Sequence, residues 1–243
     1  MQEQAKQTVV IIGGTAGIGL ATAQRLLKNY TVVIIGRNAD RLQAALQKLG
    51  DKAEGYVSDA RDKTSLEAVF QKCGIVNHVV VAAANHGGVM PLESITAEAL
   101  DEGLDGKLRV HLTAAQVAQK FLASEGSLTF ISAITARSSM ANTSLLAAVN
   151  GAIASMVPAL AVELAPRRVN AVLPGVIDTD WWEWLPGEAR EGVFEGIART
   201  LPAGRIGKAD DVADAIAFLV GNTFTTGVLL PCDGGSQLVV GKE

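Results

Sequence analysis

The segment Thr8–Gly19, TVVIIGGTAGIG, continues into LATAQRLLK and decides the fold of this chain. A short β-branched run ends in spaced glycines at positions 13, 17 and 19, and an amphipathic helical pattern follows. Such glycines permit a tight turn with positive φ and let the backbone approach a pyrophosphate closely. The helix that follows offers free N–H groups and partial positive charge to an anion. The segment therefore predicts a dinucleotide-binding turn, with a purely structural strand–helix turn as the alternative.

Short apolar runs and longer helical patterns alternate along the rest of the chain. Strands are expected at Thr8–Ile12, Thr31–Ile35, Ala53–Val57, His78–Ala82, Ser127–Ser132, Val169–Leu173 and Val228–Leu230. Helices are expected at Gly17–Lys28, Ala39–Leu49, Lys63–Lys72, Ala97–Ser124, Thr143–Ala165 and Ala209–Val220. Continuous apolar strands are typical of parallel sheets covered on both faces.

This alternation predicts an α/β fold: a single-domain Rossmann fold with a doubly wound, seven-stranded parallel sheet flanked by helices. The domain is expected to span residues 1–243. An irregular insertion at about 178–201 contains Trp181, Trp182 and Trp184. These aromatic side chains are expected either to stack on a flat substrate in a lid or to form a hydrophobic plug or subunit contact.

Composition excludes several classes of function. The chain has 243 residues, 49% of them hydrophobic, and a formal net charge of -4, which argues against nucleic-acid and anionic-membrane partners. Its two cysteines and three histidines match no metal-ligand spacing, so no metal site is expected. No run reaches the ~18 apolar residues of a membrane span, and the first residues lack signal-peptide features. We expect a cytoplasmic protein.

The end of the second strand bears on the choice of dinucleotide. An NAD-selective site usually carries an acid there for the ribose 2′-hydroxyl, whereas this chain has Gly36 followed by Arg37 and Asn38. Arg37 can bind a 2′-phosphate through charge-assisted hydrogen bonds, with the Thr15 hydroxyl in range to contribute. The alternative is an ordinary solvated arginine. The pattern favours NADP(H) over NAD(H).

Motifs spread over almost the full length resemble the short-chain dehydrogenase/reductase superfamily. They are GGTAGIG, SDARD, VVVAAA, GSLTFIS, LAVELAP with RVNAVLPGVIDT, RIGKADDVADAIAFL and TTGVLLPCDGG, in the family's order. Ile12 departs from the family's usual threonine, and three alanines replace its Asn-Ala-Gly sequence after the fourth strand. The resemblance and the glycine turn together imply a cofactor site of Gly13, Thr15, Gly17, Ile18, Gly19, Arg37, Asn38, Asp59, Ala60, Ala82, Ala83, Ala84, Asn150, Pro174, Gly175, Ile177 and Thr179.

The family's catalytic pattern of Asn, Ser, Tyr and Lys is replaced at every position. An ungapped register from LAVELAP places Asn150 at the lysine and Leu146 at the tyrosine, and the serine and asparagine fall on Ala133 and Lys107. The only tyrosines, Tyr30 and Tyr56, lie elsewhere in the sequence. A positioned general acid contributes about 10²–10⁴ in rate, so reduction of an ordinary ketone should be badly impaired.

Three residues are candidate substitutes for the missing groups. Lys107 can supply a cation if it turns into the cleft, or it is a solvated or ion-paired helix lysine. Ser132 keeps a hydroxyl next to the lost serine, but alternation along a strand points it away. His86 follows the fourth strand and can donate a proton near neutral pH, or it is an ordinary loop histidine. His111 is expected to be a packing residue.

Two further features concern the helix that carries Leu146. Pro158 lies inside it and should remove a backbone hydrogen bond and kink it. The helix is rich in alanine, and in the family it commonly packs against a symmetry mate. The resemblance therefore implies a homodimer or homotetramer.

These observations leave two hypotheses. The first is an atypical NADP(H)-dependent oxidoreductase acting on a small molecule, such as a quinone or activated dicarbonyl that needs little proton assistance. The second is a non-catalytic dinucleotide-binding protein with a regulatory or assembly role. The intact segment PGVIDT favours the enzyme, because a structural protein has no need of the nicotinamide end of the pocket.

Overall fold

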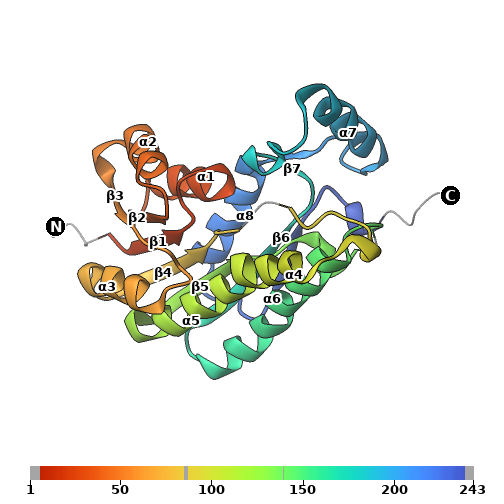
Figure 1. The fold of residues 1–243 in the computed structure, drawn as a ribbon. Coiled ribbons are helices and arrows are strands. Elements are labelled where there is room, and N and C mark those ends of the chain that lie inside the picture. Colours follow the sequence, from red (N-terminus) through yellow and green to blue (C-terminus); the bar gives the residue numbers. More distant parts are fainter. Residues whose placement is uncertain (1–5, 85–86, 139, 239–243) are drawn as a thin grey trace.

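A computed structural model describes residues 6–84, 87–138 and 140–238 and is built around a parallel sheet (Figure 1). The strand order in the described chain is β3-β2-β1-β4-β5-β6-β9, with every neighbouring pair parallel. The strands are β1 (Thr8–Ile12), β2 (Thr31–Gly36), β3 (Ala53–Val57), β4 (Val76–Val81), β5 (Leu122–Ile131), β6 (Arg168–Pro174) and β9 (Leu229–Cys232). The predicted doubly wound, seven-stranded fold is confirmed.

Helices cover both faces of the sheet, which explains why the strands are continuously apolar (Figure 1). One face packs against α3 (Lys63–Cys73), α5 (Val110–Phe121) and α6 (Ser144–Glu163), and the other against α1 (Gly17–Leu26), α2 (Ala39–Leu49) and α8 (Ala209–Gly221). Alternate residues of β1 serve the two cores. Val10 and Ile12 join the first, Val9 and Ile11 the second, and all four are at most 1% exposed.

The long helix expected at Ala97–Ser124 was predicted wrongly in its continuity and its end. It consists of α4 (Ala97–Gly103), a π-helical segment η3 (Leu104–Arg109) and α5. The chain then enters β5 at once, because Leu122 pairs with Val76 of β4. Pairing with the sheet overrides the helix propensity of residues 122–124.

The segment at 178–201 was predicted to be irregular, and its second half is a helix. A short β7 (Ile177–Asp178) pairs in parallel with β8 (Gly207–Lys208), so the two ends of the insertion lie side by side. Between them lie η5 (Asp180–Trp182) and α7 (Gly187–Thr200), which projects away from the sheet (Figure 1). The other short helical turns are η1 (Gly50–Lys52), η2 (Leu92–Ser94), η4 (Ile134–Ala136) and η6 (Ser236–Leu238).

Helix α6 runs as one element through Pro158, so the proline does not end it. By length and composition α6 is the one helix in the described residues that could cross a membrane. However, its side chains Ile153 and Val157 are fully buried in the core that also contains Leu173 of β6. Packing on the sheet therefore accounts for part of the hydropathy of α6, since 33% of its apolar window is buried.

Candidate functional site

A cleft of about 420 Å³ opens at the carboxyl ends of the strands. It lies where β1 and β4 are neighbours and the chain turns in opposite directions, the usual ligand position in doubly wound sheets. Every residue of the expected cofactor set lines it: Gly13, Thr15, Gly17, Ile18, Gly19, Arg37, Asn38, Asp59, Ala60, Ala82, Ala83, Ala84, Asn150, Pro174, Gly175, Ile177 and Thr179. Lys107, Ser132, Ala133 and Leu146 also line it, whereas His86 lies outside the described residues.

The turn after β1 has a backbone that only glycine fits. Gly13 has φ of +86°, and a Cβ there would lie 2.5 Å from the Ala83 nitrogen. A Cβ on Gly19 would lie 2.0 Å from the carbonyl oxygen of Gly13. Helix α1 begins after Ala16, whose side chain provides no cap, so the first N–H groups are left for another acceptor. This cradle fits the pyrophosphate of a dinucleotide.

The end of β2 lacks room for an acidic side chain. A Cβ on Gly36 would lie 2.5 Å from Cγ2 of Thr15. Beyond it, Asn38 accepts a hydrogen bond from the Arg41 nitrogen at 2.9 Å and begins α2. Arg37 is exposed, and Arg41 also lines the cleft. Sequence reasoning missed Arg41, although its position one turn after an N-cap asparagine could have indicated it.

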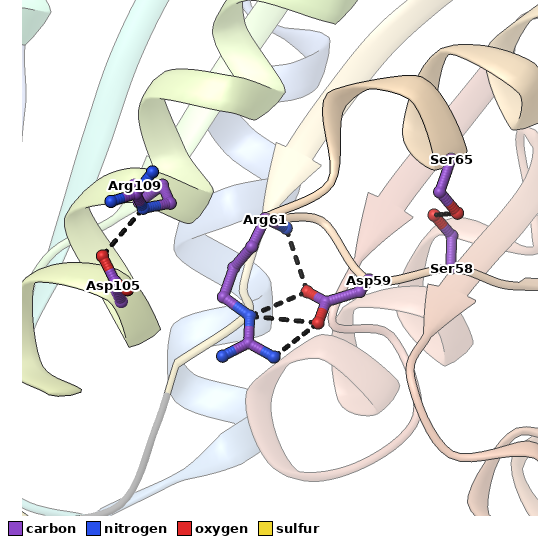
Figure 2. A network of polar contacts seen from close by, with 6 residues as sticks. All are labelled: Ser58, Asp59, Arg61, Ser65, Asp105 and Arg109. Carbon is purple, nitrogen blue, oxygen red and sulfur yellow. Dashed lines mark hydrogen bonds and ion pairs between the residues drawn. The ribbon is translucent and has the colours of Figure 1, made fainter.

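An exposed ion pair marks the adenine side of the cleft (Figure 2). The Arg61 guanidinium donates to both carboxylate oxygens of Asp59, with Nη2 2.5 Å from Oδ2. This hydrogen bonding lowers the pKa of Asp59 against the opposing effect of burial, and the charges of Arg61 and Arg37 lower it further. Asp59 is therefore ionised and fixed in orientation at neutral pH.

At the opposite end of the cleft, α6 presents Leu146 and Asn150 one turn apart. Asn150 is 1% exposed, and its Nδ2 donates to the Leu146 carbonyl at 2.9 Å and to Thr135 Oγ1 at 3.2 Å. Its Oδ1 has no hydrogen-bond partner within the described structure. A buried acceptor without a partner is costly, and a sugar hydroxyl in the cleft would satisfy it. The reacting end therefore also fits a dinucleotide.

Ser132 does not present its hydroxyl to the cleft as the lost serine would. It is 2% exposed, and its Oγ donates to the Asn150 carbonyl at 2.9 Å. This bond joins the end of β5 to α6. Ala133, at the serine position, adds no polar side chain. The expectation that strand alternation turns Ser132 away agrees with this geometry.

Lys107 is turned into the molecule rather than solvated on its helix. Its Nζ donates to the Ser132 carbonyl at 3.2 Å, and burial lowers the pKa of the amine to about 8. The neighbouring His111 is fully buried, as expected of a packing residue, and faces the carbonyls of Lys107 at 2.8 Å and Ile131 at 3.2 Å. Burial, followed by the charge of Lys107, lowers the pKa of His111 to about 3, so its imidazole is neutral.

The three tryptophans form a cluster at the opening of the cleft, at the end that contains Leu146 and Asn150. Trp181 and Trp182 line the cleft, with ring centroids 4.8 Å apart in an edge-on arrangement. Trp182 Nε1 donates to the Ile177 carbonyl at 3.0 Å, which fixes the ring, and Trp184 stacks on it at 5.9 Å. Val89 and Met140 add further apolar lining. Across the described residues, no group of three His, Cys, Asp or Glu side chains could hold a metal.

Comparison with known proteins agrees with this architecture. Residues 13–237 match the family model described as enoyl-(acyl carrier protein) reductase. The chain is 30% identical to a short-chain dehydrogenase/reductase of Stachybotrys chlorohalonatus, over 96% of this chain and 97% of that protein. The protein belongs to the short-chain dehydrogenase/reductase family, a family of NAD(P)-binding oxidoreductases.

Two solved structures bear on the cofactor and on the replaced catalytic residues. A small-chain dehydrogenase in complex with NADPH superposes with a TM-score of 0.81 at 28% identity, covering 96% of this chain and 99% of that chain. A short-chain oxidoreductase of Pseudomonas aeruginosa PAO1, which contains an atypical catalytic centre, superposes with a TM-score of 0.86. It is 27% identical, covering 94% of this chain and 96% of that chain.

Proposed function

We propose that this protein is an NADP(H)-dependent oxidoreductase that reduces activated carbonyls or quinones without a tyrosine acid. One observation carries the proposal. A single cleft combines a glycine cradle, a buried unsatisfied amide oxygen on Asn150 and an apolar mouth containing Trp181 and Trp182. A protein that used the dinucleotide only as a structural ligand would have no use for an apolar chamber beyond its nicotinamide end.

The charges at the end of β2 support the phosphorylated cofactor. Arg37 and Arg41 line the cleft there, and Gly36 leaves no room for the acid that a free 2′-hydroxyl would need. Two guanidinium groups favour a phosphate dianion. The NADPH complex of the related dehydrogenase is consistent with this preference.

The substrate class follows from what the reacting end provides. A reduced nicotinamide bound there supplies hydride. Leu146 has no proton to give, so substrates whose reduced form is a stabilised anion lose least, as quinones and α-dicarbonyls do. The ring of Trp181 and the side chains of Met140 and Val89 suit a flat, apolar molecule.

A non-catalytic dinucleotide-binding role is the second candidate. The replacement of the tyrosine by Leu146 and of the lysine by Asn150 favours it. Such a protein would bind NADPH and leave every substrate unchanged.

A turnover measurement decides between the two roles. NADPH binding is measured first by quenching of tryptophan fluorescence, and NADPH oxidation is then followed with simple ketones, α-dicarbonyls and quinones. We expect oxidation above background for quinones or dicarbonyls and little for simple ketones. The matched control is Gly19→Val, whose side chain collides with the carbonyl of Gly13 and abolishes binding. Saturable NADPH binding without turnover on the whole panel would contradict the enzyme and leave the binding role.

A further inference from the structure

A second, smaller cavity of about 130 Å³ lies directly behind the cleft. It is enclosed by α4, α6 and the loop that begins at Gly87. Among the described residues, only Lys107 and Leu146 line both the cleft and this cavity. The wall between them is therefore made by the two positions where the family pattern has its asparagine and its tyrosine.

We propose that the ammonium group of Lys107 is the proton donor to the substrate, and that the second cavity connects this group to solvent. The inference rests on the proposed function, because a proton donor is needed only if reduction occurs. It assigns to a residue of η3 the role that Leu146 cannot perform.

The contacts of Lys107 suit a donor. Its Nζ lies 3.2 Å from the Ser132 carbonyl, which uses one of three N–H groups and fixes the amine at the end of β5. Ser132 is also bonded to α6, because its hydroxyl donates a hydrogen bond to the Asn150 carbonyl. The amine is thus held between strand and helix, with two N–H groups left to meet a substrate oxygen and a water molecule.

The surroundings of Lys107 set its protonation. Glu102 is the one other titratable side chain among the described residues that line the second cavity with Lys107, and His111 lies one turn further along the helix with its Nδ1 2.8 Å from the Lys107 carbonyl. From α6 it meets Leu146 and Val149 across that cavity, and the loop contributes Gly87, Gly88 and Met90. In this mostly apolar setting burial lowers the pKa to about 8, so the amine is largely protonated at pH 7 and can still release its proton.

The step balances as an ordinary carbonyl reduction. The carbonyl carbon gains the hydride of the reduced dinucleotide, which is thereby oxidised, and the π-electron pair moves to oxygen. That oxygen takes one proton from Lys107 Nζ, which becomes a neutral amine. The cavity has room for water, and Glu102 and the Lys107 amine supply polar groups on its wall, so the amine is reprotonated from the side of Glu102. In a quinone the second oxygen takes its proton from solvent.

Kinetics of two substitutions test the role. In Lys107→Met we expect kcat to fall by about 10²-fold or more, while the Kd for NADP⁺ stays within threefold of the unmodified protein. For the unmodified protein, the reduction rate should be level below pH 8 and fall tenfold per pH unit above it, because the donor loses its proton. In Lys107→Arg this fall should be absent between pH 8 and 10, since guanidinium stays protonated. Lys48→Met, an exposed position on α2, is the control.

A readout without turnover accompanies the kinetics. Acetic anhydride acylates neutral amines, and mass spectrometry then gives the pH dependence of labelling at each lysine. Lys107 should label with a midpoint near pH 8. A midpoint for Lys107 above pH 10 would overturn the proposal. Equal turnover by Lys107→Met would overturn it and leave the proposed function intact, whereas no turnover by the unmodified, NADPH-binding protein removes both.

Discussion

The two ends of the cleft handle charge in opposite ways. At the adenosine end, charged groups are exposed and paired with one another, as in the Asp59–Arg61 ion pair shown in Figure 2. At the reacting end, Lys107 is partly buried and donates to a backbone carbonyl, and Asn150 has a side-chain oxygen without a partner in the described structure. Exposed pairs change stability by less than about 1 kcal/mol, whereas burial lowers the pKa of Lys107 from its ordinary value of 10.5 to about 8.

This difference teaches that the glycine cradle and the proposed reacting end are built from separate parts of the chain. The cradle relies on backbone geometry at Gly13 and Gly19, which no side-chain change elsewhere disturbs. The reacting end relies on a few side chains of η3, β5 and α6. Replacing Lys107 or Leu146 should change the chemistry and leave the glycine cradle in place.

The largest expected effect comes from exchanging the reacting end alone. The combined substitution Lys107→Asn, Ala133→Ser, Leu146→Tyr and Asn150→Lys recreates the family's pattern. Because a positioned acid contributes about 10²–10⁴ in rate, we expect this variant to reduce a simple ketone with NADPH faster, by about that factor, than the same variant with phenylalanine at position 146, which has neither the Lys107 amine nor the tyrosine hydroxyl. Steady-state kinetics on the purified variant measure it.

The matched control for this exchange has Leu146→Phe in place of Leu146→Tyr and should show no gain, since only the hydroxyl differs. A combined variant that binds NADPH normally but reduces the ketone no faster would contradict the separation of the two ends of the cleft. In that case the backbone of Gly88 excludes substrate from the position that it takes in the family. Gly88 lies close to residue 146, since a Cβ on Gly88 would lie 2.8 Å from Cδ2 of Leu146.

A smaller effect is expected at the adenosine end. Arg37→Ala should weaken NADPH binding by about 1.5–3 kcal/mol, or roughly 10–150-fold, because charge-assisted hydrogen bonds to the phosphate are lost. NADH binding should stay within threefold. Fluorescence titration with both cofactors measures this, and Arg25→Ala, which breaks an ion pair with Asp214 outside the cleft, is the control. Equal weakening of both cofactors would contradict a phosphate contact.

The smallest effect is expected from the exposed ion pair itself. Arg61→Ala should lower the free energy of unfolding by less than about 1 kcal/mol, because both side chains are partly solvated at 43% and 34% exposure. Urea denaturation measures the change. A loss above 2 kcal/mol would contradict the view that charged groups at this end of the cleft form only weak, solvent-exposed pairs.

Much of the fold could be predicted from the sequence because strand and helix patterns are local. The seven strands of the sheet were predicted within a few residues, apart from the early start of β5 at Leu122, which depends on pairing with Val76. Helix α7 was missed because most of its side chains face solvent and bury no apolar stripe. Such a helix lacks the periodicity on which prediction depends.

The candidate site was predictable to the extent that glycine and charge patterns dictate it. The direction of Lys107 was not, because a lysine on an expected regular helix has no sequence signal for turning inward. Arg41 and Thr135 were missed for a similar reason: their relevance depends on Asn38 capping α2 and on Asn150 reaching across from α6. Contacts between separate segments decide the roles of Lys107 and Thr135, whereas the contact of Arg41 with Asn38 is local.

The π-helical segment η3 has a consequence for the length of the chain. A π-turn accommodates one residue more than an α-helical turn. Deleting a single residue from Leu104–Arg109 would therefore let α4 continue into α5 as a regular α-helix and would remove the wide turn that carries Lys107. The wall between the two cavities is thus specified by a residue count as well as by residue identity, and it is vulnerable to a one-codon deletion that spares every side chain lining the cleft.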